Sequence, residues 1–109
     1  MAVGDGNGGS YIPTIDQTAL KNEKWSGNLD KVAINPANPN QVICESIIAP
    51  GVGGFYIREV GLFDENDTLI AISDFPESYK ATADQYELFI RMVLEVDSTD
   101  AIINMSKDV

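Results

Sequence analysis

The stretch GGFYIREVGLFDENDTLIAISDFP, residues 53–76, predicts an antiparallel β-hairpin. Two runs rich in β-branched and aromatic residues, 55–64 and 69–76, flank the polar segment 65–68. The Asp and Asn side chains of that segment are typical of tight turns, because they can hydrogen-bond the nearby backbone. The first run also places Arg58 and Glu59 side by side, and these two charges are either a catalytic pair or structural residues of the sheet.

Strand geometry favours the structural interpretation of this charged pair. Neighbouring residues of a strand point to opposite faces, so Arg58 and Glu59 cannot act together in one site. A charge set in an apolar row without a partner is costly to bury, so we expect ion pairs across strands. Strict alternation places Glu59 with Phe55, Ile57 and Phe63, and Arg58 with Tyr56, Val60 and Leu62. The expected ion pairs are Arg58 with Asp74 or Glu87, and Arg91 with Glu59 or Glu45.

The remainder of the chain adds further strands and one helix to this hairpin. Strands are predicted at 29–36 and 41–50, and a weaker one at 101–105. The strongest strand is 86–97, where Tyr86, Leu88, Ile90, Met92, Leu94 and Val96 share one face. Residues 14–27 favour a short helix, since Thr14 and Gln17 can form a capping box and Gly27 would end it.

These elements predict a mainly β fold: a small antiparallel β-sandwich or twisted sheet of five to six strands with one short N-terminal helix. The glycine-rich residues 1–14 are expected to be a flexible arm outside the core, and residues 15–109 to form the β domain. A glycine-rich arm can drape over a neighbouring subunit and gain order there. We therefore expect a partner interface at Gly4, Asp5, Gly6, Asn7, Tyr11 and Trp25.

Composition excludes several classes of function. The 109 residues suit one domain, and the net charge of −10 repels nucleic-acid phosphates and anionic membrane surfaces. No apolar run approaches the length, about 20 residues, that a membrane span needs. A single cysteine, Cys44, permits no intrachain disulfide.

The chemistry expected of an enzyme is also missing from the sequence. The chain has no histidine, so Cys44 lacks the usual activator and is expected to be a buried hydrophobe. The GVGG segment 51–54 has no Lys-Ser or Lys-Thr after it, and a flexible loop explains it. Asp5 and Asn7 have the alternating spacing of a calcium loop but no later acidic ligand. We therefore predict no catalytic, cofactor or metal site, and interpret the acidic segment 64–67 as a solvated turn.

Several segments in a fixed order resemble the amino-terminal domain of phage tail-collar fibre proteins. They are MAVGDGNG, QTALKNEKW, NPANPNQV, GGFYIREVGLFD, LIAISDFPESYK and IRMVLEVDSTDA. Such proteins are the side tail fibres of contractile-tailed temperate phages and of related phage-tail-like bacteriocins. The resemblance covers residues 1–106. It departs from the family where ATADQYELF, residues 81–89, replaces a Gly-Ser-Gly-Arg linker, and the loop around residues 80–86 is expected to differ.

The resemblance implies a structural component of a virion or bacteriocin particle, not an enzyme. In the family this domain fixes a homotrimeric fibre to baseplate proteins, and the distal fibre, absent here, contacts the host receptor. Assembly takes place in the host cytoplasm. Family members extend further at both ends, so this chain is either trimmed or a shortened module. Two alternatives stay open: a receptor- or carbohydrate-binding module, and a glycan depolymerase with paired carboxylates, for which no spacing signal is present.

Overall fold

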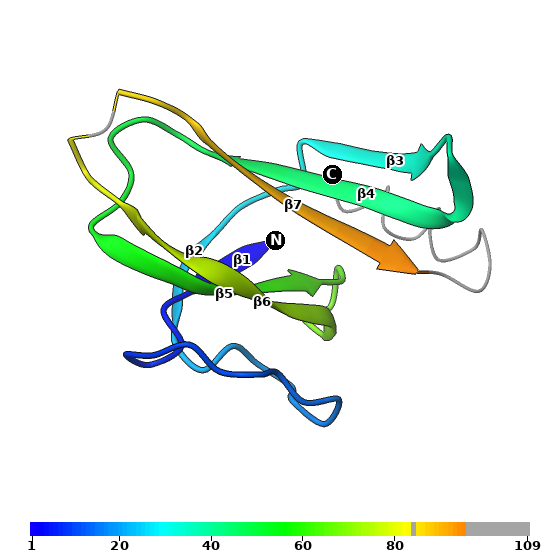
Figure 1. The fold of residues 1–109 in the computed structure, drawn as a ribbon, viewed down its shortest axis with the longest axis horizontal. Helices are drawn as coiled ribbons and strands as arrows, with labels where there is room; N and C mark the ends of the chain where they lie inside the picture. Colours follow the sequence, from blue (N-terminus) through cyan, green and yellow to red (C-terminus); the bar gives the residue numbers. More distant parts are fainter. Residues whose placement is uncertain (84, 96–109) are drawn as a thin grey trace.

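The computed structural model describes residues 1–83 and 85–95, and these residues form seven strands in two antiparallel sheets (Figure 1). The first sheet has the order β2-β1-β5-β6 and the second β3-β4-β7. The mainly β class is confirmed. The strands are β1 Ala2–Gly4, β2 Glu23–Ser26, β3 Lys31–Asn35, β4 Asn38–Ile48, β5 Phe55–Phe63, β6 Leu69–Lys80 and β7 Leu88–Glu95.

The hairpin predicted from residues 53–76 is confirmed as β5 and β6, with β6 running four residues further than expected, to Lys80. Asp64 closes the turn, because its backbone N–H donates to the Thr68 carbonyl and its carboxylate accepts from the N–H groups of Asn66 and Thr68. Asp67 adopts a positive φ of 60°, a conformation that Asp and Asn tolerate better than most residues.

An apolar core lies between the two sheets. Alternate residues of β4 and β7 face it, and their registers bring Cys44 opposite Met92 and Ser46 opposite Ile90. Tyr86 precedes β7 and is exposed, so it does not share the core face, while Val96 and the predicted strand 101–105 lie outside the described residues. The core consists of Met1, Val3, Leu29, Val42, Cys44, Ile48, Ile57, Val60, Leu62, Ile90 and Met92.

The face alternation expected for β5 is wrong after Ile57. Ile57 pairs with Ser78 and Glu59 with Asp74, so β6 advances by four residues while β5 advances by two. This bulge breaks strict alternation. Val60 and Leu62 consequently join Ile57 in the core, instead of sharing a face with Arg58, and Glu59 faces away from the second sheet.

The amino end also differs from the prediction of an arm outside the core. Residues 2–4 form β1, an inner strand that pairs with β2 on one side and β5 on the other. Ala2 and Val3 are buried, and Met1 joins the core. Two apolar residues at the start of a glycine-rich segment are enough to fill an inner strand position, since both neighbouring strands satisfy its backbone groups.

The predicted N-terminal helix is absent from the described structure. Residues 5–22, here called the strap, connect β1 to β2 without any strand or helix. Of the predicted helix only one turn is present, in which the Gln17 N–H donates to the Thr14 carbonyl at 3.2 Å. The strap covers the outer face of the first sheet, on the side away from the second sheet (Figure 1). The molecule therefore has three layers: sheet, sheet and strap.

Candidate functional site

Glu59 lies between the first sheet and the strap and is completely buried. The bulge in β6, opposite Ile57 and Glu59 of β5, turns the Glu59 side chain to this side, where the strap crosses the sheet. A carboxylate buried this deeply needs hydrogen-bond donors around it, because burial alone strongly disfavours its charge.

The strap supplies four donors to the Glu59 carboxylate. One oxygen, Oε2, accepts from the backbone N–H groups of Gly6 at 3.0 Å and Asn22 at 2.9 Å. The other, Oε1, accepts from the Lys21 N–H at 2.8 Å and from the Tyr11 hydroxyl. An ionised carboxylate has about four acceptor positions, so its hydrogen-bonding capacity is filled.

These donors also determine the ionisation of the carboxyl group. Burial by itself raises the pKa of Glu59, but the hydrogen bonds from Tyr11, Asn22, Lys21 and Gly6 favour the charged form and outweigh it. The net result is a pKa below the ordinary value of a glutamate. Glu59 is therefore a charged structural centre, held by backbone amides instead of the arginine that the sequence analysis expected.

Two glycines allow the strap and the sheet to approach Glu59 closely. A Cβ atom at Gly4 would lie 2.4 Å from both the Asn22 carbonyl oxygen and the Glu59 Oε2 atom. At Gly61, which follows on the same face of β5, a Cβ would lie 2.9 Å from Leu20, the buried apolar residue of the strap. Because glycine has no side chain, the strap can pack against the sheet at both of these positions.

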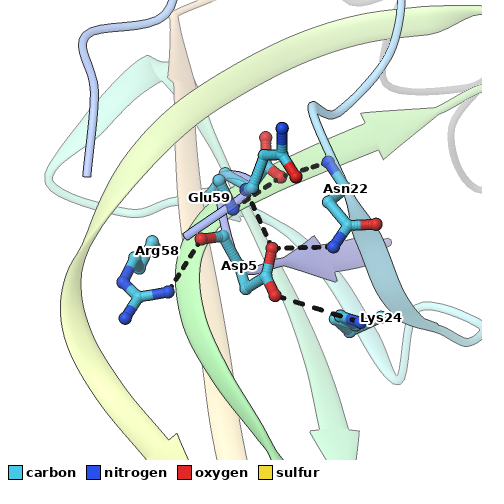
Figure 2. Close-up of polar contacts among 7 residues, drawn as sticks. Asp5, Asn22, Lys24, Arg58 and Glu59 are labelled. Carbon is cyan, nitrogen blue, oxygen red and sulfur yellow. Dashed lines mark hydrogen bonds and ion pairs between the residues drawn. The ribbon is translucent and has the colours of Figure 1, made fainter. Parts of the chain in front are cut away.

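A second group of polar contacts extends from Asp5 at the edge of the same site (Figure 2). The Asp5 carboxylate accepts from the Asn22 side-chain amide at 2.9 Å and lies 3.9 Å from the Lys24 ammonium. Burial raises the pKa of Asp5, but these partners, the Asn7 N–H and Arg58 lower it overall. Arg58 donates to the Asp5 carbonyl at 2.9 Å, which ties the start of the strap to β5.

Of the two ion pairs predicted across strands, the one of Arg58 is wrong and the one of Arg91 is confirmed. Arg58 pairs with Glu77 at 2.6 Å, and neither Asp74 nor Glu87 is its partner, because the bulge places Glu77 beside it. Arg91 pairs with Glu45 at 2.7 Å, one of the two carboxylates that the sequence offered. This pair lies on the outer face of the second sheet and takes no part in the site around Glu59.

The six residues expected at an interface divide between internal and surface positions. Gly4 and Gly6 are buried, Asp5 and Tyr11 are half-buried around Glu59, and Asn7 is exposed. Trp25 belongs to β2 and packs against the core. The structure thus brings most of them together with Glu59, a grouping that the sequence did not reveal because the separation in the chain is large.

The outward side of the strap carries two isoleucines that the sequence analysis missed. Ile15 is 100% exposed and Ile12 is 86% exposed. Ile15 lines a groove of about 290 Å³ between the strap and β6, together with residues that include Ile70 and Ile72. The only sequence signal for Ile12 and Ile15 is their place within a polar, proline-containing segment, YIPTID.

The outer surface of the β5–β6 hairpin carries a pair of exposed tyrosines. The rings of Tyr56 and Tyr79 lie 4.9 Å apart and are tilted by 60°. The guanidinium of Arg58 lies 4.5 Å from the Tyr56 ring centre, a cation–π arrangement.

Other chemical features of the described residues are structural. Cys44 is fully buried, and burial raises its pKa to about 11, so the reactive thiolate is disfavoured. Within residues 1–83 and 85–95, no cluster of three or more histidine, cysteine, aspartate or glutamate side chains is arranged to hold a metal ion. The same residues contain no helix with the length and apolar character of a membrane span.

The chain is similar to known proteins of phage tails. The chain matches the family described as "Phage tail-collar fibre protein, N-terminal" over residues 1–105. It is 48% identical over 80 residues to a "Probable tail fiber protein" of Escherichia phage P2, and the alignment covers 73% of this chain and 12% of that relative. The chain therefore spans a small fraction of the length of this relative. No solved structure matches it.

Proposed function

This chain belongs to the phage tail-collar fibre protein family, in its N-terminal domain, and on that premise we propose that it attaches a homotrimeric tail fibre to the baseplate. The family makes it a structural component of a phage tail. Attachment of the fibre to the baseplate is the more specific function that we propose. The observation that carries it is the position of the match: nearly the whole chain aligns with the N-terminal part of a fibre family, and the relative is far longer.

Two surfaces of the fold support this role. The strap is held at several points yet presents exposed isoleucines, as a preformed docking segment would. On the second sheet, Phe89 and Val93 are 61% and 50% exposed on the outer face of β7. Such apolar surface suits contacts between copies of the chain in a homotrimer.

The remaining parts of the proposal concern the whole fibre. Distal segments beyond this domain contact the host receptor, and the fibre is assembled in the host cytoplasm, in a phage or a phage-tail-like bacteriocin. The domain itself is not an enzyme. Its buried carboxylate supports that view, because four donors occupy the positions that a substrate proton or a metal would need.

A binding experiment tests the attachment function. Tail particles assembled without fibres, obtained by inactivating the gene for this chain, are mixed with the purified 109-residue chain. We expect saturable binding to the particles and a trimer mass by light scattering. A chain that is monomeric at micromolar concentration and does not bind fibreless particles would contradict the proposal.

A carbohydrate-binding function is the second candidate, and the exposed pair of Tyr56 and Tyr79 favours it. Aromatic rings with polar tips are common in sugar sites, although Arg58 already covers one ring here. Calorimetric titration with surface polysaccharide from host cells tests this alternative. Heat of binding that disappears in a Tyr79→Ala variant would support it, and the absence of heat with the parent chain would exclude it.

A further inference from the structure

We propose that the groove between the strap and β6 is the surface that receives a tail protein, and that this partner presents an apolar side chain flanked by basic residues. The inference rests on the proposed attachment function and names the site and the chemistry of its partner. Its evidence comes from three independent features of the described residues: the shape of the groove, the way the strap is closed, and the charge around it.

The groove is lined by aliphatic and polar residues and is open to solvent. Its volume is about 290 Å³, which matches one or two partner side chains rather than a large ligand. The lining residues are Pro13, Thr14, Ile15 and Gln17 from the strap and residues 69–72, Leu-Ile-Ala-Ile, from β6. Ile15 is 100% exposed and Ile70 is 45% exposed, so aliphatic surface on both walls faces water. Covering it with a partner would remove that surface from water.

Hydrogen bonds close the strap on itself around the two exposed isoleucines. The Gln17 side-chain amide donates to the Tyr11 hydroxyl at 2.6 Å and to the Ala19 carbonyl at 2.8 Å. Tyr11 in turn donates to Glu59, so residues 11–17 form a short loop whose base is fixed to the sheet. Ile12 and Ile15 lie within this loop. Their exposure is therefore built into an ordered segment, and docking would require little further ordering.

Charge complementarity indicates the character of the partner. Asp16, which is exposed, lies between the groove residues Ile15 and Gln17. The acidic turn 64–67 is separated from Leu69 of the other wall by Thr68, and its carboxylates line a neighbouring hollow, not the groove itself. The chain as a whole has a net charge of −10. A partner surface with lysine or arginine beside its apolar side chain would be attracted to this region, and an acidic one repelled.

The substitution Ile15→Ser tests the groove without disturbing the fold. Ile15 is fully exposed, so the variant should melt at the same temperature as the parent and keep its mass by light scattering. We expect its affinity for fibreless tail particles to fall at least about tenfold, as for a central interface residue. The matched control is Val52→Ser, an exposed aliphatic residue outside the groove, which should bind like the parent.

The outcomes separate this inference from the function on which it rests. Failure of the parent chain to bind particles overturns attachment itself. Binding by the parent that is equalled by Ile15→Ser overturns the groove and leaves attachment standing. A loss of trimer mass in Ile15→Ser would show that the occupant is a second copy of this chain, which also overturns the proposal. Binding that does not weaken between about 50 and 300 mM salt would overturn the basic character of the partner.

Discussion

The two faces of the first sheet are held to their neighbours by opposite kinds of interaction. One face meets the second sheet through an apolar core that includes Ile57, Val60 and Leu62. The other face meets the strap mainly through the Glu59 carboxylate, with one buried leucine, Leu20, and the hydrogen bond from Arg58 to the Asp5 carbonyl beside it. A single strand, β5, supplies both the core residues named above and Glu59, because the bulge in the neighbouring β6 turns Glu59 away from the core.

This difference separates the stability of the domain from the order of its surface segment. The free energy gained by apolar burial is roughly proportional to the buried area. It is shared by many residues, so a single polar substitution removes only part of it. The strap depends on directional hydrogen bonds to one group, so loss of that group should release it locally. The comparison predicts that the strap can be detached while the two sheets remain folded.

The largest effect is expected from a cavity in the core. Ile57→Ala removes a completely buried side chain between the sheets and should lower the free energy of unfolding by about 2–5 kcal/mol. Urea denaturation measures this loss. If Ile57→Ala destabilised the domain less than the Glu59 variant described next, the apolar core would contribute less to stability than the hydrogen bonds of the strap, contrary to this prediction.

A smaller, local effect is expected from Glu59→Gln. The neutral amide offers one acceptor oxygen and adds donors that face the N–H groups of the strap, so the free energy of unfolding should fall by about 1–3 kcal/mol. Hydrogen exchange should accelerate at the amides of Gly6, Lys21 and Asn22 and stay unchanged at Cys44 in β4. Glu65→Gln, which changes an exposed carboxylate in the turn between β5 and β6, is the control. Equal acceleration in both sheets would show that the strap and the core unfold together.

At acid pH the parent and the Glu59→Gln variant should have the same free energy of unfolding. The pKa of Glu59 is lowered in the folded state, so its contribution is fully present above the unfolded value, about 4.3. It is lost as the pH falls from there through the lower folded value. The pKa of Asp5 is also lowered, but Asp5 is present in both proteins, so its contribution cancels in the difference between their free energies of unfolding. Denaturation from pH 7 to pH 2.5 measures the difference, and a gap that widened in acid would contradict this ionisation.

The smallest effect is expected for Arg91→Met on the outer face of the second sheet. The Arg91 side chain is 58% exposed, and its pair with Glu45 is screened by water. Exposed pairs of this kind contribute roughly 0–1 kcal/mol. Thermal melts of the two chains should nearly coincide. A shift as large as that of Glu59→Gln would mean that surface charges, and not the buried carboxylate, organise this domain.

The strands were predictable from sequence because their signals are local. Alternating apolar residues, with Asp and Asn at the turn, located β4, β5, β6 and β7. The helix predicted for residues 14–27 was wrong, because the N–H groups of Lys21 and Asn22 bond Glu59 instead of a helical carbonyl. Tertiary contacts of this kind override intrinsic helix propensity.

The site around Glu59 was not predictable for a related reason. Two extra residues in β6 break its register with β5 and reverse the direction of Glu59. The sequence signal for this bulge is Pro76, which lies within the irregular stretch of β6, but a proline alone does not give the direction of Glu59. The role of residues 2–4 was hidden because three residues show no period, and their burial depends on β5, far along the chain. Exposure of Ile12 and Ile15 likewise depends on how the strap closes, not on their neighbours in sequence.

The position of β1 between β2 and β5 has a consequence for biosynthesis. Val3 pairs with Val60, and Gly4 with Glu59, so β1 cannot be enclosed until the ribosome has released residues beyond 60. The strap likewise cannot become ordered until β5 has been synthesised, because its backbone N–H groups bond the Glu59 carboxylate of that strand. Closing such a long loop is slow compared with forming a local turn. Nascent chains should therefore carry a disordered strap, and the segment proposed to dock on the tail would become competent only after translation has passed β5.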